Sequence, residues 1–252
     1  MKTVAIIQAR MSSSRLPGKV LKEAGGRPLL DRMVERVRLA KRIDETVVAT
    51  TVDPSDDTIA EFCTKAEIPV FRGNLMDVLD RYYQASLAYH ADTVVRLTGD
   101  CPFIDPKLVD ETLDLMSNEK ADFACNRLPP PMTRTYPIGL DVEAVTFAAL
   151  KTAWENAAEK HEREHVMPYF YEIPGRYKVV KLDNAVDYGA LRWTVDTLED
   201  LEFVRAVYAA LDNRNDFSWL DVLKLVQEHP ELSKINADVH HKTMFDVDHR
   251  NK

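Results

Sequence analysis

Cysteine is scarce in this chain, and its scarcity excludes several classes of protein. The sequence has only three cysteines, Cys63, Cys101 and Cys125, among 252 residues. Their number is odd and their spacing matches no metal-ligand motif, so neither a disulfide framework nor a zinc site is predicted. The sequence therefore favours a reducing, cytoplasmic compartment.

Long apolar runs and an excess of positive charge are also missing. The N-terminal apolar run spans about six residues, too short for a signal peptide or a membrane span, so we expect no membrane association. The formal net charge is −8. A duplex-binding protein needs a broad basic face, so no nucleic-acid partner is predicted.

The positive charge that the chain does have is concentrated at its N-terminal end. Residues 1–42 hold eleven Lys or Arg and three Asp or Glu, a net of +8, so residues 43–252 carry −16. Five of these basic residues fall in a helical pattern from Pro28 to about Leu39 or just after it, where charge runs are usually solvated. We accordingly expect an exposed face formed by Arg32, Arg36, Arg38, Lys41 and Arg42.

Three cations differ, because they lie in the loop before that helix. The segment VAIIQARMSSSRLPGKVL, residues 4–21, begins as a short buried strand and continues into a loop of small residues. Serine hydroxyls, free backbone N–H groups and fixed cations together suit a polyphosphate. Neither G-x-x-x-x-G-K-[ST] nor G-x-G-x-x-G is present. The predicted phosphate ligands are Arg10, Ser12, Ser13, Ser14, Arg15 and Lys19.

Strand and helix patterns alternate along the first half of the chain, which predicts an α/β fold, Rossmann-like, with a mostly parallel sheet and helices on both faces. The expected strands are 4–7, 46–51, 69–71, 93–97 and 190–195, and the expected helices are 28–39, 53–63, 77–90, 106–116, 197–211 and 217–227. In such sheets ligands bind beyond the carboxyl ends of the strands.

The pattern changes in the middle of the chain. Residues 126–185 begin with four prolines in 126–137 and are predicted to form an excursion from the sheet. Within it we expect a strand at 140–144, a helix at 146–158, helical structure at 161–171 and a strand at 177–182. The domain is predicted to span 1–211, followed by a C-terminal helix and polar tail at 212–252.

Two carboxylates each follow an expected strand. Asp100 lies in RLTGDCP and Asp196 in RWTVDT, so both can reach the mouth where the phosphate loop lies. Mg²⁺ prefers few carboxylates together with phosphate oxygens and water, and one Asp from each of two strand ends fits that demand. The structural alternatives are a turn residue for Asp100 and a helix N-cap for Asp196.

The string QARMSSSRLPGKVL resembles the signature of the sugar nucleotidyltransferases, and most closely that of the cytidylyltransferase branch and its SpsF-like spore-coat polysaccharide group. LTGDCPFIDP and RWTVDTLEDLE resemble the two metal-bearing segments of that family. The resemblance implies a nucleotide-diphospho-sugar transferase fold, CTP and Mg²⁺, with Asp100 and Asp196 on the metal. It covers roughly residues 1–211.

That resemblance implies transfer of CMP to an acidic sugar, Kdo- or nonulosonate-like, with release of pyrophosphate, in surface polysaccharide synthesis. Lys19 and Arg15 would hold the triphosphate, so both join Asp100 and Asp196 as catalytic candidates. The stretch FRGNLMDVLDRYY resembles the family's segment near the cytosine and ribose. Predicted nucleoside contacts are Thr50, Arg72 and Arg81, each with a surface salt bridge or plain strand-end position as its alternative.

The acceptor side is predicted from two further strings. YPIGLDVE, 136–143, resembles that group's acceptor-side strand, with Asp141 and Glu143 on alternate faces, and REHVMPYFY resembles its own signature. Arg163 and His165 are therefore predicted acceptor contacts, with a purely structural role for Arg163 as the alternative. HEREH, 161–165, matches the H-E-x-x-H zinc pattern, but the phosphate loop makes a metalloprotease a poor interpretation.

A homodimer is also predicted. Members of the resembling families pair through the excursion, where this chain has aromatic and apolar residues that we expect to form an exposed patch. These residues are Tyr136, Ile138, Val166, Tyr169, Phe170 and Tyr171.

Alternatives to the main prediction remain open. One is a nucleotidyltransferase that uses another NTP, or a phosphonate or other non-sugar acceptor. The other is a non-catalytic nucleotide-binding protein on the same fold. The sequence does not identify the acceptor.

Overall fold

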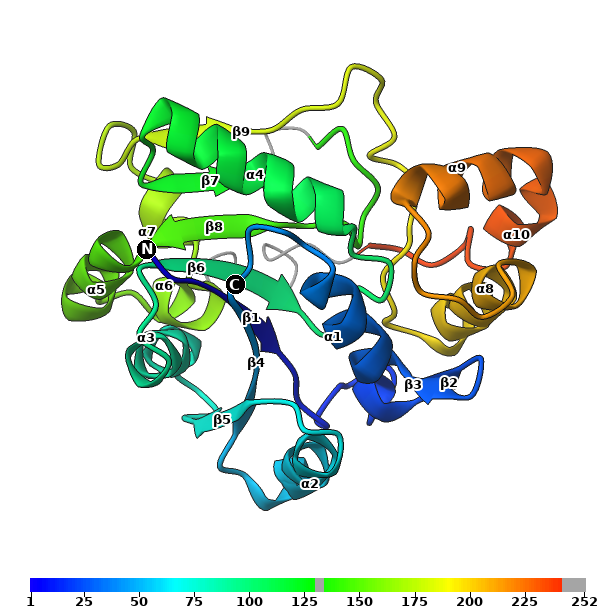
Figure 1. The fold of residues 1–252 in the computed structure, drawn as a ribbon, viewed down its shortest axis with the longest axis horizontal. Helices are drawn as coiled ribbons and strands as arrows, with labels where there is room; N and C mark the ends of the chain where they lie inside the picture. Colours follow the sequence, from blue (N-terminus) through cyan, green and yellow to red (C-terminus); the bar gives the residue numbers. More distant parts are fainter. Residues whose placement is uncertain (130–133, 242–252) are drawn as a thin grey trace.

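A seven-stranded sheet runs through the protein, and we describe it from a computed structural model covering residues 1–129 and 134–241 (Figure 1). Residues 130–133 of the predicted excursion and 242–252 of the predicted tail lie outside the described residues. The strand order is β5-β4-β1-β6-β8-β7-β9. The strands are β1 (Thr3–Gln8), β4 (Glu45–Thr51), β5 (Val70–Gly73), β6 (Thr93–Thr98), β7 (Phe123–Cys125), β8 (Glu143–Thr146) and β9 (Val179–Lys181).

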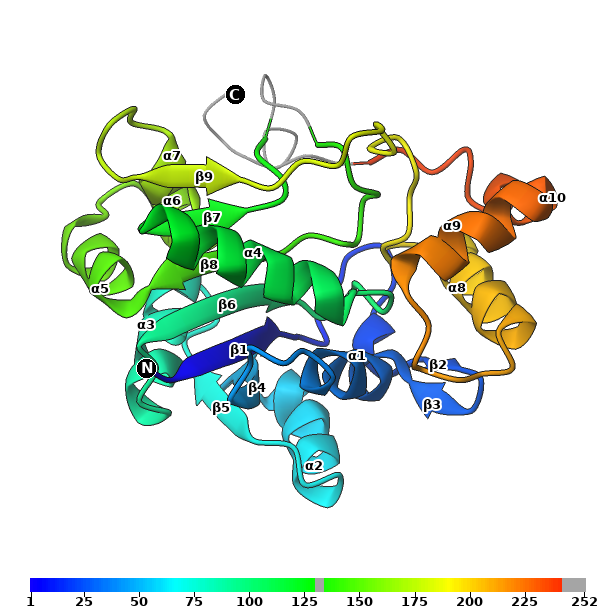
Figure 2. The same ribbon diagram turned by 45° about the horizontal axis from the view of Figure 1, so that its top comes forward.

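The strands β5, β4, β1 and β6 run parallel to one another, as predicted. The three central ones, β4, β1 and β6, are buried along most of their length, which is typical of a parallel sheet covered by helices. β8 then runs antiparallel to both β6 and β7, and β9 lies parallel to β7 at the edge (Figure 2). The mostly parallel α/β fold is thus confirmed.

Helices cover both faces of the sheet. One face packs on α1 (Leu29–Arg38), α2 (Asp57–Lys65), α4 (Pro106–Glu119), α8 (Leu198–Ala210) and α9 (Trp219–Glu228), whose apolar residues form one hydrophobic core. The other face packs on α3 (Val78–Ala88), α5 (Phe147–Asn156), α6 (Lys160–His165) and α7 (Pro168–Tyr171), which form a second core. Short elements complete the chain: η1 (Lys19–Leu21), β2 (Glu23–Ala24), β3 (Arg27–Pro28), η2 (Pro54–Asp56) and α10 (Pro230–Lys234).

The predicted excursion at 126–185 differs from the structure, because β8 and β9 belong to the main sheet. Its first strand also starts later than expected, at Glu143 instead of Leu140. Gly139 has a φ of 104°, a left-handed conformation, and a Cβ there would lie 2.7 Å from the backbone of Trp193. Residues 139–142 therefore bend towards 193–194 and do not extend β8.

The strand predicted at 190–195 is absent from the described residues as a regular strand. Only a single parallel bridge, Ile138 to Arg192, forms there. Hydrogen bonds from Trp193 N to Ile138 O (2.7 Å) and from Val195 N to Asp100 O (2.8 Å) nevertheless fix this loop beside the end of β6.

The helix predicted over 161–171 is interrupted. Val166 has a φ of 68°, and Pro168 cannot donate to a continuing helix, so α6 ends and α7 begins across this break. The elements β7 and α10 were not predicted, since each is too short to show a periodic pattern.

Arg32 and Arg36 contradict the expected solvated helix face, because both are fully buried. Arg36 donates to the carbonyl oxygens of Ile104 and Asn215, at 2.8 and 2.7 Å, and stacks on the ring of Phe217. Arg32 bonds backbone carbonyls at 24 and 213 and stacks on Tyr208. These two side chains tie α1 to the C-terminal helices.

Replacing Arg36 with Ala is expected to lower the free energy of unfolding by about 3 kcal/mol, because it leaves buried carbonyls unpaired and opens a space beside Phe217. Urea denaturation measures this. Arg38→Ala, on the exposed side of the same helix, is the control and is expected to stay within about 0.5 kcal/mol of the parent. Equal effects for both variants would contradict the structural role of Arg36.

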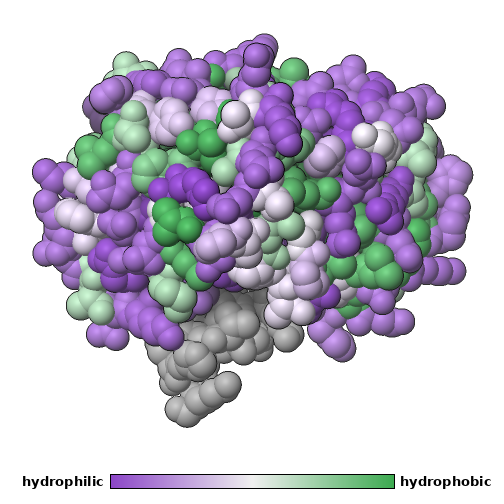
Figure 3. All heavy atoms as spheres, turned by 90° about the horizontal axis from the view of Figure 1, so that it is seen from below, coloured by the Kyte–Doolittle hydropathy of each residue, from purple (hydrophilic) through white to green (hydrophobic). Residues whose placement is uncertain are grey.

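The exposed aromatic patch expected for a homodimer is not formed by the predicted residues. Tyr136, Ile138, Val166, Tyr169 and Phe170 are buried in the chain's own core, and Tyr171 is half-buried. On the face shown in Figure 3, hydrophobic side chains lie in small groups among hydrophilic ones. A homodimer consequently stays a prediction from the family resemblance, without the patch that motivated it.

Candidate active site

The carboxyl ends of β1 and β6 open onto a compact cluster of charged side chains. At its centre the ammonium group of Lys19 donates to Asp100 Oδ2 at 2.7 Å, Asp196 Oδ1 at 2.8 Å and the carbonyl oxygen of Val195 at 2.7 Å. Lys19 is 8% exposed. All three ammonium protons therefore have acceptors, and the two carboxylates predicted to bind a metal converge on one cation.

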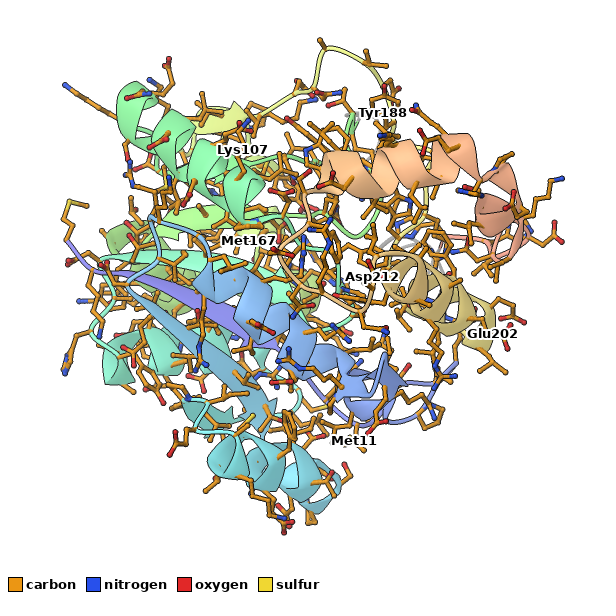
Figure 4. All side chains as sticks on the ribbon, turned by 45° about the vertical axis from the view of Figure 1, so that its right-hand side comes forward. Met11, Lys107, Met167, Tyr188, Glu202 and Asp212 are labelled. Atoms are coloured by element: carbon orange, nitrogen blue, oxygen red, sulfur yellow. The ribbon has the colours of Figure 1, made fainter. Side chains whose placement is uncertain are left out.

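The chain positions Lys19 through the loop that follows β1. Gly18 has a φ of 68°, a left-handed conformation, and is the N-cap of η1. Lys19 follows it as the first residue of η1 and contacts Asp100 and Asp196. Met11, labelled in Figure 4 between α1 and α2, anchors the other end of the loop: its backbone N–H donates to Asp56 Oδ1 at 2.6 Å.

Asp100 and Asp196 are held by the backbone around them. Gly99 N donates to Gln8 O at 2.8 Å, and a Cβ on Gly99 would lie 3.0 Å from that oxygen, so the loop after β6 lies directly against β1. Asp196 N donates to Asp200 Oδ2 at 2.9 Å. Asp200 also forms the capping box of α8 with Thr197, so the N-cap of this helix is Thr197 and not Asp196.

Asp196 is surrounded by cations. Arg15 NH2 and Arg192 NH2 both lie 2.9 Å from its Oδ2. Burial favours the neutral acid, but Lys19, Arg192 and Arg15 outweigh it and hold the pKa of Asp196 at about 2. Burial likewise lowers the pKa of Lys19, yet Asp100 and Asp196 outweigh it and raise that pKa above its ordinary value. Lys19 and Asp196 are therefore both charged at neutral pH.

This arrangement predicts a pH dependence of stability. A depressed carboxyl pKa stabilises the fold above the unfolded value of 3.8 and loses that contribution as the pH falls to about 2. In Lys19→Met the pKa of Asp196 is expected to lie closer to 3.8, so stability should fall less between these two pH values. Urea denaturation at a series of pH values measures both slopes, and identical slopes would contradict the pairing.

A cavity of about 270 Å³ lies beside the cluster, on the side of the phosphate loop. Of the predicted phosphate ligands, Arg10, Ser13, Ser14, Arg15 and Lys19 line it, together with Asp100 and Asp196, whereas Ser12 does not. Gln8 lines it too, and its buried Oε1 has no hydrogen-bond partner among the described residues. The cavity is polar and mostly cationic at its loop side, as a triphosphate requires.

Of the predicted nucleoside contacts, Thr50 lies near the end of β4, Arg72 in β5 and Arg81 in α3, and none of them lines this cavity. Thr50 is opposite Arg72 across the two strands, and Arg72 donates to Thr51 O at 2.8 Å and pairs with Asp57 at 2.6 Å. Arg81 is 1% exposed and donates to Asn74 O at 2.8 Å. Burial lowers the pKa of Arg81. Contact of these three residues with a nucleotide stays a prediction.

A second cavity, of about 380 Å³, adjoins the first. Both are lined by Ser14, Arg15, Thr98, Asp100 and Asp196. The second also includes the predicted acceptor residues Asp141, Glu143 and His165, together with Arg96 and Arg127. The carboxylates of Asp100 and Asp196 thus lie where the two cavities meet, and Lys19, which lines the first cavity, bonds both of them.

Asp141 and Glu143 both line the second cavity. Side chains two residues apart point to the same face of a strand, so the prediction that these two lie on alternate faces was wrong. Burial raises the pKa of Asp141, but Arg134 and Arg127, at 3.0 and 3.2 Å, outweigh burial and lower it. Glu143 is 5% exposed and pairs with Arg96, its register partner on β6.

Arg163 is placed away from this cavity, which corrects its prediction as an acceptor contact. Its guanidinium group bonds Asp77 Oδ2 at 2.7 Å and the carbonyl oxygen of Trp154 at 3.1 Å. It consequently ties α6 to α3 and α5, as the structural alternative held. His165 does line the cavity, whereas His161 contacts Glu172 at 3.0 Å.

Sequence reasoning missed two residues of the cluster. Arg192 is 9% exposed and bridges Asp196 to both oxygens of Asp200, at 2.9 and 2.8 Å. His241 lines the second cavity from the C-terminal segment. Arg192 could have been found from its position four residues before Asp196, with which it pairs. No local pattern in the sequence marks His241.

Comparisons with known proteins agree with this geometry. The family described as cytidylyltransferase matches residues 4–224. The chain is 35% identical to the spore coat polysaccharide biosynthesis protein SpsF of Bacillus subtilis, over 90% of this chain and 95% of that protein. It is 31% identical to a 3-deoxy-manno-octulosonate cytidylyltransferase of Thermodesulfovibrio yellowstonii, over 47% of this chain and 49% of that one.

Solved structures extend the comparison to the fold. A cytidylyltransferase from Leptospira borgpetersenii superposes with a TM-score of 0.88 and 34% identity, covering 96% of this chain and all of that one. A CMP:2-keto-3-deoxy-manno-octonic acid synthetase complexed with CTP superposes with a TM-score of 0.60 over 83% of this chain and 99% of that one, at 21% identity. The predicted nucleotide-diphospho-sugar transferase fold is confirmed.

Proposed function

The chain belongs to the cytidylyltransferase family, and we propose that it transfers CMP from CTP to an acidic sugar, Kdo- or nonulosonate-like, with release of pyrophosphate. The family match makes the chain a cytidylyltransferase. The proposal concerns the identity of its nucleotide donor and of its acceptor. The acids in the names of relatives support the choice of acceptor, and SpsF supports a place in surface polysaccharide synthesis.

One observation carries the proposal: Asp100 and Asp196 meet at a single cation between two adjoining cavities. The first cavity has the cations for a triphosphate, and the second is lined by the acceptor-side residues. An acceptor oxygen in the second cavity would attack the α-phosphorus of a nucleotide in the first. The bond to the bridging oxygen breaks, pyrophosphate leaves, and the acceptor hydroxyl releases its proton to water.

The side chains of this cluster suit such a reaction through alignment and charge. Lys19 and Arg15 would hold phosphate oxygens on which negative charge grows in the transition state. Arg192 would hold Asp196 in place through the hydrogen bonds described above. Arg192 and the backbone already hold Asp196 in place, whereas Lys19 and Arg15 would exchange carboxylate partners for phosphate oxygens when the substrates and the metal bind.

The donor set also fits Mg²⁺, the proposed cofactor. Oxygens of Asp100 and Asp196 already converge on one cation, at 2.7 and 2.8 Å. Mg²⁺ is typically bound by one or two carboxylates together with substrate phosphate oxygens, and these two residues would supply the carboxylates. When bound, the ion would neutralise charge on the α-phosphate and the attacking oxygen.

Pyrophosphate release tests the proposal. CTP, ATP, GTP and UTP are each incubated with a panel of acceptors, including 3-deoxy-manno-octulosonate and a sialic acid, with Mg²⁺ and with EDTA. We expect release with CTP and an acidic sugar that EDTA abolishes. Release with another NTP or with a phosphonate acceptor would favour the alternative transferase, and no release under any condition would favour a non-catalytic nucleotide-binding protein.

Two further proposals concern the setting of the enzyme. The described part of the chain has no helix long and apolar enough to cross a membrane. We place the protein in the cytoplasm, with support from three cysteines that are buried free thiols. The homodimer is proposed from the family resemblance, and light scattering at micromolar concentration measures it; a monomer mass would contradict it.

A further inference from the structure

The C-terminal segment returns to the active site. After α10 the chain runs back along 190–193, and Asn236 is 5% exposed there. Its side-chain amide donates to the carbonyl oxygen of Arg192 at 3.1 Å and to Asp200 Oδ1 at 3.0 Å. The segment 236–241 is therefore anchored on the two residues that hold Asp196.

His241, an exposed residue, lies at the edge of the acceptor cavity. It lines that cavity together with Asp141 and His165. It also lines a neighbouring cavity of about 380 Å³ formed with residues 236–240, and Ile138 is common to both. The segment thus lies between the two spaces and forms a wall of the acceptor cavity.

A contact with Arg192 fixes the tautomer of His241. The Nδ1 atom lies 3.2 Å from Arg192 NH1. A guanidinium group only donates, so Nδ1 must accept and the ring proton must lie on Nε2. Burial and the nearby Arg134 and Arg192 also lower the pKa of His241, although Asp141 opposes them, so the neutral ring is favoured.

The arginines of the cavity are already paired. The three arginines that line it each contact a carboxylate: Arg15 with Asp196, Arg96 with Glu143 and Arg127 with Asp141. An acidic acceptor would have to compete with these internal carboxylates. Within residues 1–129 and 134–241 the hydrogen bond of His241 is made by Nδ1, so its Nε2–H group is a donor that faces no such competition there.

We propose that the segment 236–241 is the acceptor-selecting wall of this enzyme, in which the Nε2–H group of His241 donates a hydrogen bond to an anionic oxygen of the acceptor. This inference rests on the proposed function. The residues that hold the phosphate loop and the two carboxylates would perform the transfer, and the segment 236–241 would choose the molecule that receives CMP.

Steady-state kinetics test the proposal in the full chain, with CTP, Mg²⁺ and the acceptor of the panel that the parent enzyme uses fastest. We expect His241→Ala to raise the acceptor KM about tenfold while the CTP KM stays unchanged. His241→Gln, which keeps an N–H donor, should recover part of the loss. His240→Ala is the matched control, because His240 is exposed like His241 but lines only the neighbouring cavity.

A second measurement separates contact from structure. Imidazole ¹⁵N resonances of His241 should shift when the acceptor is added to the CTP-bound protein, whereas those of His229, beside Glu231, should not. An unchanged acceptor KM in an active His241→Ala enzyme would overturn this inference and leave the proposed function standing. A rise in both KM values together with a lowered Tm would replace it with a structural role. A parent enzyme that releases no pyrophosphate with any acceptor would overturn the proposed function as well.

Discussion

Asp100→Asn and Asp196→Asn are each expected to lower turnover by about a hundredfold to a thousandfold at saturating CTP and Mg²⁺. Each substitution preserves shape but removes one of the two negative charges that converge between the cavities. A cation held there by a single carboxylate would be placed less firmly beside the α-phosphorus. Pyrophosphate release measures the turnover directly.

Binding of CTP without metal separates this role from a general loss of the site. In EDTA the affinity for CTP should stay the same or rise, because removing a carboxylate reduces its repulsion of the triphosphate. Asp216→Asn is a suitable control, since this carboxylate is 73% exposed and pairs only with Arg214 in the described part of the chain. Near-parental turnover in either active-site variant would refute the two-aspartate assignment.

Much of the fold could be predicted because its signals are local. The strands β1, β4 and β6 are apolar runs with β-branched residues, and the helices α1, α3 and α4 have clear apolar faces, so each was placed within a few residues. Parallel pairing followed from their alternation. The predictions that were wrong concern segments whose structure depends on distant contacts. The segment 190–195, for example, lies against the bend at Gly139, about fifty residues earlier, and forms a single bridge there instead of a strand.

The buried arginines of α1 show the same limit. Arg32 and Arg36 look like an ordinary basic helix face, since most of the carbonyls and rings that bury them lie far along the chain, at residues 104, 208, 213, 215 and 217. No pattern within α1 indicates that its basic face has partners 180 residues away. Charge alone therefore does not predict exposure when a later segment supplies acceptors.

For the site, the residues that adjoin the ends of β1 and β6 could be predicted, because parallel strand ends meet at one edge. Lys19, Asp100 and Arg15 are such residues, and the structure brings them together with Asp196. Arg163 was predicted from a string without knowledge of Asp77, which pairs with it. His241 could not be predicted at all, because its place depends on how the chain returns after α10.

Lys19→Met is expected to lower CTP affinity in the presence of Mg²⁺ by about 10- to 100-fold, and CMP affinity much less. Lys19 lines the phosphate cavity, and its proposed partners, once it exchanges a carboxylate for a phosphate, are the triphosphate oxygens that CMP lacks. Turnover should fall at least as far as affinity, since the charge of Lys19 also counters the developing charge of the leaving pyrophosphate. Titration calorimetry with both nucleotides measures the difference.

The same variant should change binding of the metal alone in the opposite direction. In the parent protein Lys19 occupies the point where Asp100 and Asp196 converge, so it competes with any other cation for their oxygens. Without it the two carboxylates repel each other, and Mg²⁺ in the absence of nucleotide should bind more tightly. Lys22→Met, in the same basic segment but outside the lining of the cavity, is the control. Equal losses for CTP and CMP, with unchanged metal affinity, would show that Lys19 acts only as a structural counter-ion. We expect the opposite result, because Lys19 lines the phosphate cavity and its charge is the one that Asp100 and Asp196 share.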